Sequence, residues 1–520
     1  GGNGIHSDST LNISGQASIQ NATGGSGKYG GDGIRSNSTL NIFGQASIQK
    51  ATGGTGTTTA GSGIYSRGDL SISQSAQIKN ATGGDNQSTG GSGIYSVGEL
   101  TISGGTIGTA QGGNGNSSRS GTGGDGIYSK TMEILGGIIQ KAIGGNAKGN
   151  TCTGGSGIHS DGTLTISGGE IQQATGGDST GNSGKGGTGI RGDQVVKISG
   201  GAIGSAKGGS GDSGGAGIGT GAKPAFATEI NISGGTITEA TGGTGGAGIG
   251  SGSNSSTATT INIIGGTIKN ATGTDGGAGI GGGKNSSGAT NVNISGGEVN
   301  ASTGCGNGGA GIGGGKESSG ATNIEITGDA LVSAGSSGSA AIGSGESSTG
   351  ETTINIHDTN PEKGVKSAFA YGGAGIGSGD GSTGQTTVTI KSGTIKNATG
   401  GNTGDGIGGG CDSKNITVKI EGGTIEKAKG GDGYGSHDAG DGIHSDGELT
   451  IPDKATIVSS IGGNGDSRNS SSNAGHGIYS GGKLTIKGDI GTAQGGKGKT
   501  TAGHGIYSKG DLNISDNATI

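Results

Sequence analysis

The chain has 520 residues, of which 139 are glycine and 26% are apolar, and its formal net charge is −6. Acidic and basic residues are mixed along the chain without a basic run, which excludes the electrostatic footprint of a nucleic-acid-binding protein. No stretch approaches the roughly 18 apolar residues of a membrane-spanning helix, so the sequence predicts no membrane span.

An isoleucine, almost always preceded by glycine, returns along the whole chain and is called the anchor here. Seventeen anchors occur with spacings of 28 to 36 residues: Ile5, Ile34, Ile64, Ile94, Ile127, Ile158, Ile190, Ile218, Ile249, Ile280, Ile312, Ile342, Ile376, Ile407, Ile443, Ile478 and Ile506. Internal repetition with such a period is typical of a stacked solenoid.

Each repeat contains short segments in which apolar and polar residues alternate. After the anchor Ile158, Leu164 and Ile166 alternate with polar residues, which predicts a strand with one buried face. Ile171 follows a Gly-Gly pair that can turn a corner, and Ala174 ends a third short strand. We therefore predict an all-β fold, a right-handed parallel β-helix of about 17 coils of ~31 residues with three short strands per coil.

The coils are of two types, which differ in where their long loop lies. The anchor precedes the next strand by five or six residues in the first type and by eleven or twelve in the second. We expect one continuous solenoid over 1–520 with three sub-regions. These are 1–210 with a long return loop, 211–420 with Gly-Ile-Gly anchors and the loop at another corner, and 421–520 with the first coil type again.

The residue after each anchor, called the outer position here, is expected to face outward. Tyrosines occupy it in two groups of successive coils: Tyr65, Tyr95 and Tyr128, then Tyr479 and Tyr507. Such stripes are candidate glycan-binding sites, because tyrosine rings stack on sugars and their hydroxyls add hydrogen bonds. The alternative is a ladder of rings that stack on one another and cover the sheet.

One acidic loop, residues 431–446, is the candidate metal site. It holds Asp432, Asp438, Asp441 and Asp446, whose carboxylates together with backbone carbonyls would suit calcium. The alternative is a solvated acidic loop, and the sequence predicts no other cofactor. Cys152, Cys305 and Cys411 lie in separate coils, too far apart for an intrachain disulfide.

The string His-Ser-Asp occurs at 6–8, 159–161 and 444–446. A catalytic triad needs three groups that converge, whereas neighbours alternate across a strand, so we interpret these strings as repeat drift and predict no enzyme. The irregular coil at 357–371 is either a functional insertion or a structural defect.

Several strings resemble those of known families. Gly-Gly-Ala-Gly-Ile-Gly-Gly-Gly at 276–283 and 308–315, with Leu-Thr-Ile-Ser-Gly-Gly at 164–169, resembles secreted Gram-positive, clostridial-type Gly-rich repeat surface proteins. The Asp-Gly-Ile strings that begin at Asp32, Asp125, Asp405 and Asp441 are more weakly similar to calcium-dependent carbohydrate-binding right-handed β-helix proteins. The resemblance implies an extracellular or cell-surface location and glycan binding.

We expect an extracellular structural and adhesive rod or filament segment that presents a repeated surface. The alternative is a glycan-binding β-helix module that uses the tyrosine stripes, and a polysaccharide lyase or hydrolase is less favoured because β-helices host such enzymes by fold analogy alone. The expected partners are polysaccharide and a continuation of the stack, by further coils or by a second copy end to end, because neither end shows a polar cap.

Overall fold

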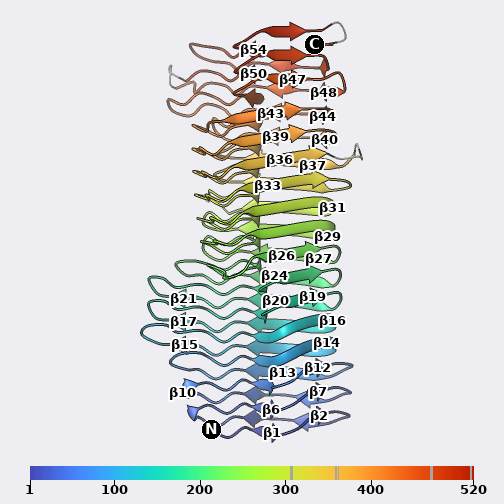
Figure 1. The fold of residues 1–520 in the computed structure, drawn as a ribbon, viewed down its shortest axis with the longest axis vertical. Coiled ribbons are helices and arrows are strands. Elements are labelled where there is room, and N and C mark those ends of the chain that lie inside the picture. The colour runs from blue at the N-terminus through green and yellow to red at the C-terminus, as the bar shows by residue number, and fades with distance from the viewer. Residues whose placement is uncertain (305–307, 358–359, 361, 469–471, 516–517) are drawn as a thin grey trace. The chain divides into compact units, whose positions relative to one another are not determined.

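The computed structural model describes residues 1–304, 308–357, 360, 362–468, 472–515 and 518–520. These residues form strands, turns and loops, with no helix among them, in two compact units, Gly1–Thr257 and Ala258–Ile520 (Figure 1). Together the units hold about 16 turns of ~31 residues, whereas the sequence predicts about 17. The predicted all-β solenoid of parallel strands is confirmed. Whether the two units form one continuous solenoid stays a prediction.

Each turn in Gly1–Thr257 begins with a strand that contains the anchor. These strands are β1 (Ile5–Ser7), β6 (Ile34–Ser36), β11 (Ile64–Ser66), β14 (Ile94–Gln111), β16 (Ile127–Ile143), β18 (Ile158–Ser160), β22 (Ile190–Gly192), β25 (Ile218–Gly219) and β28 (Ile249–Gly250). The remaining strands of the turns are β2 (Leu11–Ile13), β3 (Ser18–Ile19), β4 (Ala22–Thr23), β7 (Leu40–Ile42), β8 (Ser47–Ile48), β9 (Ala51–Thr52), β12 (Leu70–Ile72), β13 (Gln77–Thr82), β19 (Thr163–Ile166), β20 (Glu170–Thr175), β23 (Val195–Ile198), β24 (Ala202–Lys207), β26 (Thr228–Ile232) and β27 (Thr236–Thr241). The return loops add β5 (Gly27–Tyr29) paired with β10 (Gly56–Thr59), and a three-stranded sheet of β15 (Gly115–Asn116), β17 (Ala147–Lys148) and β21 (Ser179–Thr180).

The turns of Ala258–Ile520 are built in the same way. Their anchor strands are β30 (Ile280–Gly281), β32 (Ile312–Gly313), β35 (Ile342–Gly343), β38 (Ile376–Gly377), β42 (Ile407–Gly408), β46 (Ile443–Ser445), β50 (Ile478–Ser480) and β54 (Ile506–Ser508). The others are β29 (Thr259–Gly273), β31 (Thr290–Thr303), β33 (Thr322–Thr327), β34 (Leu331–Ser336), β36 (Thr352–His357), β37 (Gly364–Ala370), β39 (Thr386–Ile390), β40 (Thr394–Ile395), β41 (Ala398–Thr399), β43 (Ile416–Ile420), β44 (Gly423–Ile425), β45 (Ala428–Lys429), β47 (Leu449–Ile451), β48 (Ala455–Ile457), β49 (Ser460–Ile461), β51 (Leu484–Ile486), β52 (Asp489–Ile490), β53 (Ala493–Gln494) and β55 (Leu512–Ile514).

Equivalent residues of successive turns pair in parallel register, so each repeat position forms a ladder along the stack. Ile64 pairs with Ile94, and Ile94 with Ile127, and all three side chains are fully buried. The Leu and Ile pairs of the second strand stack in the same way, as Leu70 on Leu100. Because fully burying one such side chain contributes about 1.5–3 kcal/mol, a narrow core of ladders suffices to hold a glycine-rich chain together.

The outer position differs between the two coil types. The stripe tyrosines are half-buried there, as expected, but the glycines that follow the anchors at 218–408 are buried. These glycines have φ between 130° and 150°: Gly219, Gly250, Gly281, Gly313, Gly343, Gly377 and Gly408. The expectation of an outward-facing position is therefore wrong at five of these glycines, where a Cβ would meet the carbonyl oxygen of the following turn at 1.7–2.0 Å: Gly219, Gly281, Gly313, Gly343 and Gly377. A Cβ on Gly408 would instead meet side-chain atoms of Asp405 and His444.

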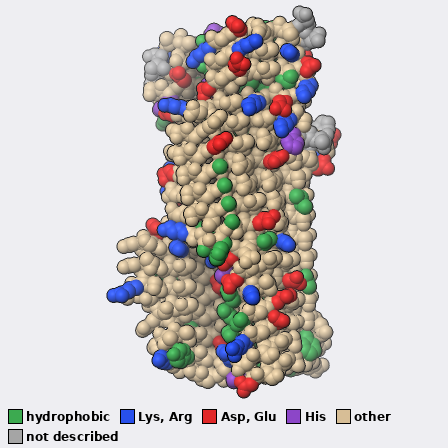
Figure 2. All heavy atoms as spheres, in the orientation of Figure 1, with side chains coloured by type: hydrophobic (Ala, Val, Ile, Leu, Met, Phe, Trp, Pro, Cys, Tyr) green, Lys and Arg blue, Asp and Glu red, His purple; other side chains and the backbone are tan. Residues whose placement is uncertain are grey.

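Acidic and basic side chains are interspersed on the face of the molecule shown in Figure 2, in keeping with the mixed charge of the sequence. A search of the described part of the chain finds no helix with the length and apolar character needed to cross a membrane. Cys305 lies outside the described residues, and so does part of the irregular coil at 357–371, at residues 358, 359 and 361.

Candidate functional site

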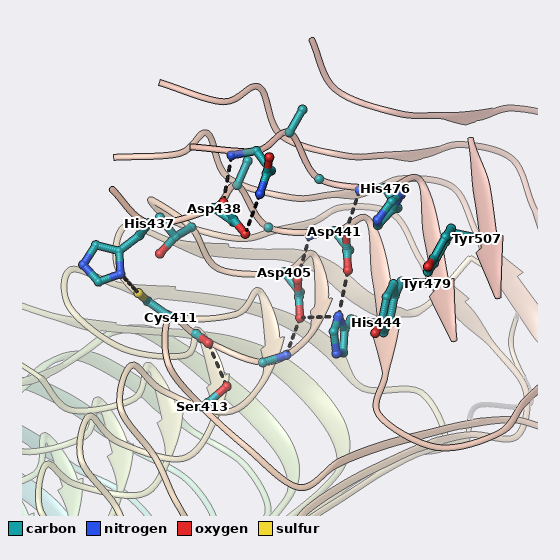
Figure 3. Close-up of a pocket in the computed structure, with 18 of the residues that line it drawn as sticks. Asp405, Cys411, Ser413, His437, Asp438, Asp441, His444, His476, Tyr479 and Tyr507 are labelled. Carbon is teal, nitrogen blue, oxygen red and sulfur yellow. Dashed lines mark hydrogen bonds and ion pairs between the residues drawn. The ribbon is translucent and has the colours of Figure 1, made fainter. Parts of the chain in front are cut away.

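The described residues of Ala258–Ile520 enclose a pocket of about 840 Å³ (Figure 3). Its lining comes from the segments before and after β42, from the loops that precede β46, β50 and β54, and from one residue on each of these three strands. Four successive turns therefore contribute side chains from equivalent positions, and these side chains form two ladders side by side.

The first ladder lies two residues before the anchors, at what is called the tie position here. It reads Asp405, Asp441, His476 and His504. The second ladder is the outer position, where His444 is followed by Tyr479 and Tyr507. The rings stack along the axis, with centroids 4.4 Å apart for His444 and Tyr479 and 5.6 Å apart for Tyr479 and Tyr507.

An aspartate at the tie position connects its own turn to the next one. One oxygen of Asp405 accepts a hydrogen bond from the backbone N–H of Asp441 at 2.7 Å, and Asp441 likewise accepts from the N–H of His476 at 2.5 Å. Asp32 and Asp125 accept in the same way from the turns that follow them. The Asp of each Asp-Gly-Ile string thus has a structural role that the sequence analysis missed.

His444 lies between three carboxylates. Its Nδ1 is 2.7 Å from Asp441 Oδ2 and 3.9 Å from Asp405 Oδ2, and its Nε2 is 3.2 Å from Asp446 Oδ1. Burial alone would lower the pKa of His444, but the charge of Asp405 and hydrogen bonds to Asp441 and Asp446 raise that pKa well above its usual 6.5. His444 is therefore an imidazolium that donates from both ring nitrogens.

Asp405 and Asp441 are both buried carboxyls. Burial raises the pKa of Asp405 to about 7, an effect that the positive charge of His444 opposes. Asp446, by contrast, has a lowered pKa because His444 donates a hydrogen bond to it. His444 therefore lies between Asp405, whose carboxyl holds its proton to near-neutral pH, and Asp446, whose carboxylate stays ionised.

Two groups of pocket residues have ligand atoms close enough together to hold a metal ion: Asp405, Asp441 and His444, and Cys411, Asp412 and His437. In the first group, the 2.7 Å between His444 and Asp441 is a charge-assisted hydrogen-bond distance, so a proton occupies the place of an ion. In the second group, His437 Nδ1 lies 3.4 Å from Cys411 Sγ and 3.7 Å from Asp412 Oδ2. Burial raises the pKa of Cys411 to about 11, which makes it a neutral thiol in this state.

The four predicted calcium ligands separate into two kinds of contact. Asp441 and Asp446 meet at His444, whereas Asp432 and Asp438 reach along the axis and accept hydrogen bonds from the backbone N–H groups of Asn464 and Asn473 at 2.8 and 2.7 Å. Their carboxylates do not converge on one point among the described residues. Calcium binding by this set stays a prediction.

The two tyrosine stripes are both ladders of stacked rings. Tyr65 and Tyr95 lie 5.4 Å apart with an interplanar angle of 6°, and Tyr95 and Tyr128 lie 4.5 Å apart at 16°. The facing sides of these rings thus contact one another, and the Tyr128 hydroxyl donates a hydrogen bond to Asp161. The structure brings Tyr479 and Tyr507 into the pocket near Asp438 and Asp441, while the other three tyrosines lie in Gly1–Thr257.

In the His-Ser-Asp strings, the serine points away from the other two residues. His159 and Asp161 lie on the same side of their strand, with Nε2 and Oδ1 3.6 Å apart. Ser160 is buried and lies within hydrogen-bonding distance of the carbonyls of Lys130 and Thr163, both at 3.1 Å. The serine oxygen is thus engaged with backbone and is not aligned with the histidine for nucleophilic attack.

The fold and the pocket define the chain as a β-solenoid repeat protein whose turns carry aligned ladders of His, Asp and Tyr. Comparison with protein families, curated proteins and solved structures finds no match to this chain.

Proposed function

We propose that the chain is an extracellular structural and adhesive rod or filament segment whose stacked turns present a repeated surface. The observation that carries this proposal is the in-register pairing of equivalent residues turn after turn, as in the ladder of Ile64, Ile94 and Ile127. Polar side chains follow the same rule: Asn41 donates to Asn12 at 2.8 Å, and Asn293 donates to Asn262 at 2.8 Å. These polar side chains bond to the equivalent residues of neighbouring turns. Such an arrangement suits a structural spacer better than a catalytic site. Continuation of the stack by further turns or by a second copy belongs to the same proposal.

Small-angle scattering and electron microscopy of the full chain test the structural role. At a rise of about 4.8 Å per turn, some 16 turns should give a particle roughly 75–80 Å long. An elongated particle of that length, or a filament whose length increases with protein concentration, would support the proposal. A compact globule, or a flexible chain without β-sheet signal in circular dichroism, would refute it.

A second candidate function, glycan binding, is favoured by the composition of the pocket. Its volume lies in the range of small-molecule sites, and Tyr507, His504, Lys509, Asn473 and Asp438 supply ring edges, donors and acceptors. A polysaccharide offers hydroxyl groups and apolar ring faces that such a lining would recognise.

Binding of the full chain to a glycan array, followed by calorimetry on any hit, tests this function. We expect Tyr507→Phe and Lys509→Ala to weaken binding at least severalfold. The matched control is Tyr434→Phe, an exposed tyrosine outside the pocket lining. Equal binding by all three variants would exclude the pocket as the glycan site.

A further inference from the structure

A second cluster of ligand-type side chains lies in Gly1–Thr257, apart from the pocket. His159 extends from β18, Asp161 follows that strand, and Asp193 follows β22 of the next turn. We propose that His159, Asp161 and Asp193 bind a divalent transition-metal ion of the zinc type.

The distances from His159 Nε2 to the two carboxylates are those expected between atoms that bind one metal ion. His159 Nε2 lies 3.6 Å from Asp161 Oδ1 and 3.6 Å from Asp193 Oδ1. An N–H···O hydrogen bond spans about 2.7–3.2 Å, so neither contact is a hydrogen bond. Two ligand atoms at about 2.0–2.2 Å from one tetrahedral ion, however, lie roughly 3.4 Å apart. The two contacts of His159 therefore match a metal site to within a few tenths of an ångström, and the ligand atoms of all three residues lie within 4.8 Å of one another.

The Nε2 atom of His159 has no other partner. The His159 side chain is 12% exposed, and its Nε2 is enclosed and makes no hydrogen bond. A buried polar atom without a hydrogen-bond partner carries a desolvation cost. An ion between this nitrogen and the two carboxylates would remove that cost.

Each of the three ligands is held in place by a further contact. His159 Nδ1 is 3.0 Å from Asp125 Oδ2, so its N–H donates there, and Nε2 is the nitrogen that would bind a metal once its proton is displaced. The Tyr128 hydroxyl donates to Asp161 Oδ2, and Arg191 Nε donates to Asp193 Oδ1 at 2.5 Å. A carboxylate on the outer nitrogen of a histidine is the common support of protein metal ligands.

The charges in the cluster also favour a divalent cation. Burial lowers the pKa of His159, but the charge and hydrogen bond of Asp125 and the contact with Asp193 raise it to about 9, so a metal ion would have to displace a proton from its ring. With that proton gone, the carboxylates of Asp125, Asp161 and Asp193 outnumber the single guanidinium of Arg191 by two. A doubly charged ion balances them in a site where uncompensated charge is costly. Asp161 is 50% exposed, so an ion could enter from its side, and a water molecule or ligand would complete four-coordination.

The equivalent histidine in Ala258–Ile520 gives a contrast. His444 belongs to the same string, but its nitrogens are 2.7 and 3.2 Å from Asp441 and Asp446, which are hydrogen-bond distances. Both of its nitrogens have partners, so that histidine holds protons. Of these two histidines, His159 is the one whose contacts of 3.6 Å to two carboxylates leave room for an ion.

The test is calorimetric titration of Zn²⁺ into chelator-treated full chain, with Cu²⁺ electron paramagnetic resonance to identify nitrogen ligation. The Cys411→Ser background removes the competing thiol. We expect one equivalent of Zn²⁺ and a single-imidazole signal for Cu²⁺. His159→Asn should abolish this equivalent, and Asp193→Asn should weaken it at least tenfold. The matched control His444→Asn should keep it.

Circular dichroism and hydrogen exchange check that each variant remains folded. Asp161→Asn keeps the contact of His159 with Asp125, so it tests the site even if His159→Asn destabilises the turn. No Zn²⁺ binding by the background chain would overturn the proposal. Retention of full affinity by folded Asp161→Asn and Asp193→Asn together would do so as well.

Discussion

Two sets of turns have the same anchor isoleucines but differ at the outer position, which follows the anchor. One set has large side chains there and the other has glycine. In Gly1–Thr257, Tyr65, Tyr95 and Tyr128 fill the outer position with stacked rings. In Ala258–Ile520, Gly281 and Gly313 occupy the outer position, and the backbones of successive turns approach closely there. A Cβ on Gly281 would lie 2.0 Å from the carbonyl oxygen of Gly313. The glycines are therefore not neutral filler. One repeat position accepts either large side chains or none, depending on the local path of the chain.

Replacing one of the outer-position glycines should cause the largest loss of stability. Gly313 has φ of 130°, and an added Cβ would meet the carbonyl oxygen of Gly343 at 2.0 Å. Backbone strain alone costs about 1–3 kcal/mol, and the overlap adds to it, so Gly313→Ala should destabilise its turn by about 3 kcal/mol or more. Hydrogen exchange with mass spectrometry should show lost protection in β32 and β35.

The matched control for that experiment is Gly447→Ala. No atom lies within 4 Å of a Cβ built on Gly447. Its substitution should change protection little. If the two variants behave alike, the close backbone approach does not stabilise these turns.

Removing a ring from the first set should have an intermediate effect. Tyr95 stacks on rings at both faces, and each aromatic pair contributes about 0.5–1.5 kcal/mol beyond area burial. Tyr95→Ala should therefore cost roughly 1–3 kcal/mol in chemical denaturation, whereas Tyr95→Phe should keep most of the stacking. A loss as large in Tyr95→Phe would show that the hydroxyl, not the ring, stabilises the ladder.

The border between the two coil types should respond to pH. His444 is the first side chain at the outer position after Gly408, and its folded pKa lies well above 6.5. A raised pKa means that the folded state holds the proton more tightly, so this stabilisation is complete below pH ~6.5 and is lost as pH rises through the folded pKa. The melting temperature should fall as the pH increases above ~6.5.

In His444→Asn, the decline in melting temperature above pH ~6.5 should become shallower. It should not vanish, because burial lowers the pKa of His159 but Asp125 and Asp193 raise it to about 9. Burial raises the pKa of Asp405 to about 7. Titration of Asp405 therefore also lowers the stability of the folded state as the pH rises from ~3.8 to about 7. The variant should therefore keep a decline in that lower range. An unchanged profile above pH ~6.5 would rule out His444 as the titrating group.

The smallest expected effect is at the buried serines that follow the outer position. Ser66 Oγ lies 2.9 Å from the carbonyl of Ser38 and 2.8 Å from that of Asp69. Ser66→Ala should cost about 0.5–1.5 kcal/mol, because it removes one net hydrogen bond. Local hydrogen exchange at β11 measures this, and an increase in protection would contradict it.

The ladders could be predicted because their signal is local and repeated. Leu70 and Ile72 alternate with polar residues, and the same pair returns about 30 residues later as Leu100 and Ile102, which is the register that the structure has. The tyrosine ladder was one of two alternatives that the sequence left open.

The contacts of the candidate site were harder to predict, because a solenoid pairs a residue with its equivalent one turn away. Asp432 and Asp438 lie close to Asp441 in sequence, yet they bond to Asn464 and Asn473 in the next turn. Aligning the repeats two residues before each anchor would have revealed the ladder of Asp405, Asp441, His476 and His504. The positive φ of the central glycines has no such signal, since glycine is abundant throughout.

The in-register pairing has a consequence for inheritance. Tyr65 pairs with Tyr95, and Tyr95 with Tyr128, so a recombination event that removes residues 95–127 would join Ile94 directly to Tyr128. Tyr128 would then stack on Tyr65, and the ladders would remain in phase. Unequal crossing-over between repeats of such a gene can therefore add or remove whole turns. Each product keeps its ladders in register and so keeps the solenoid fold.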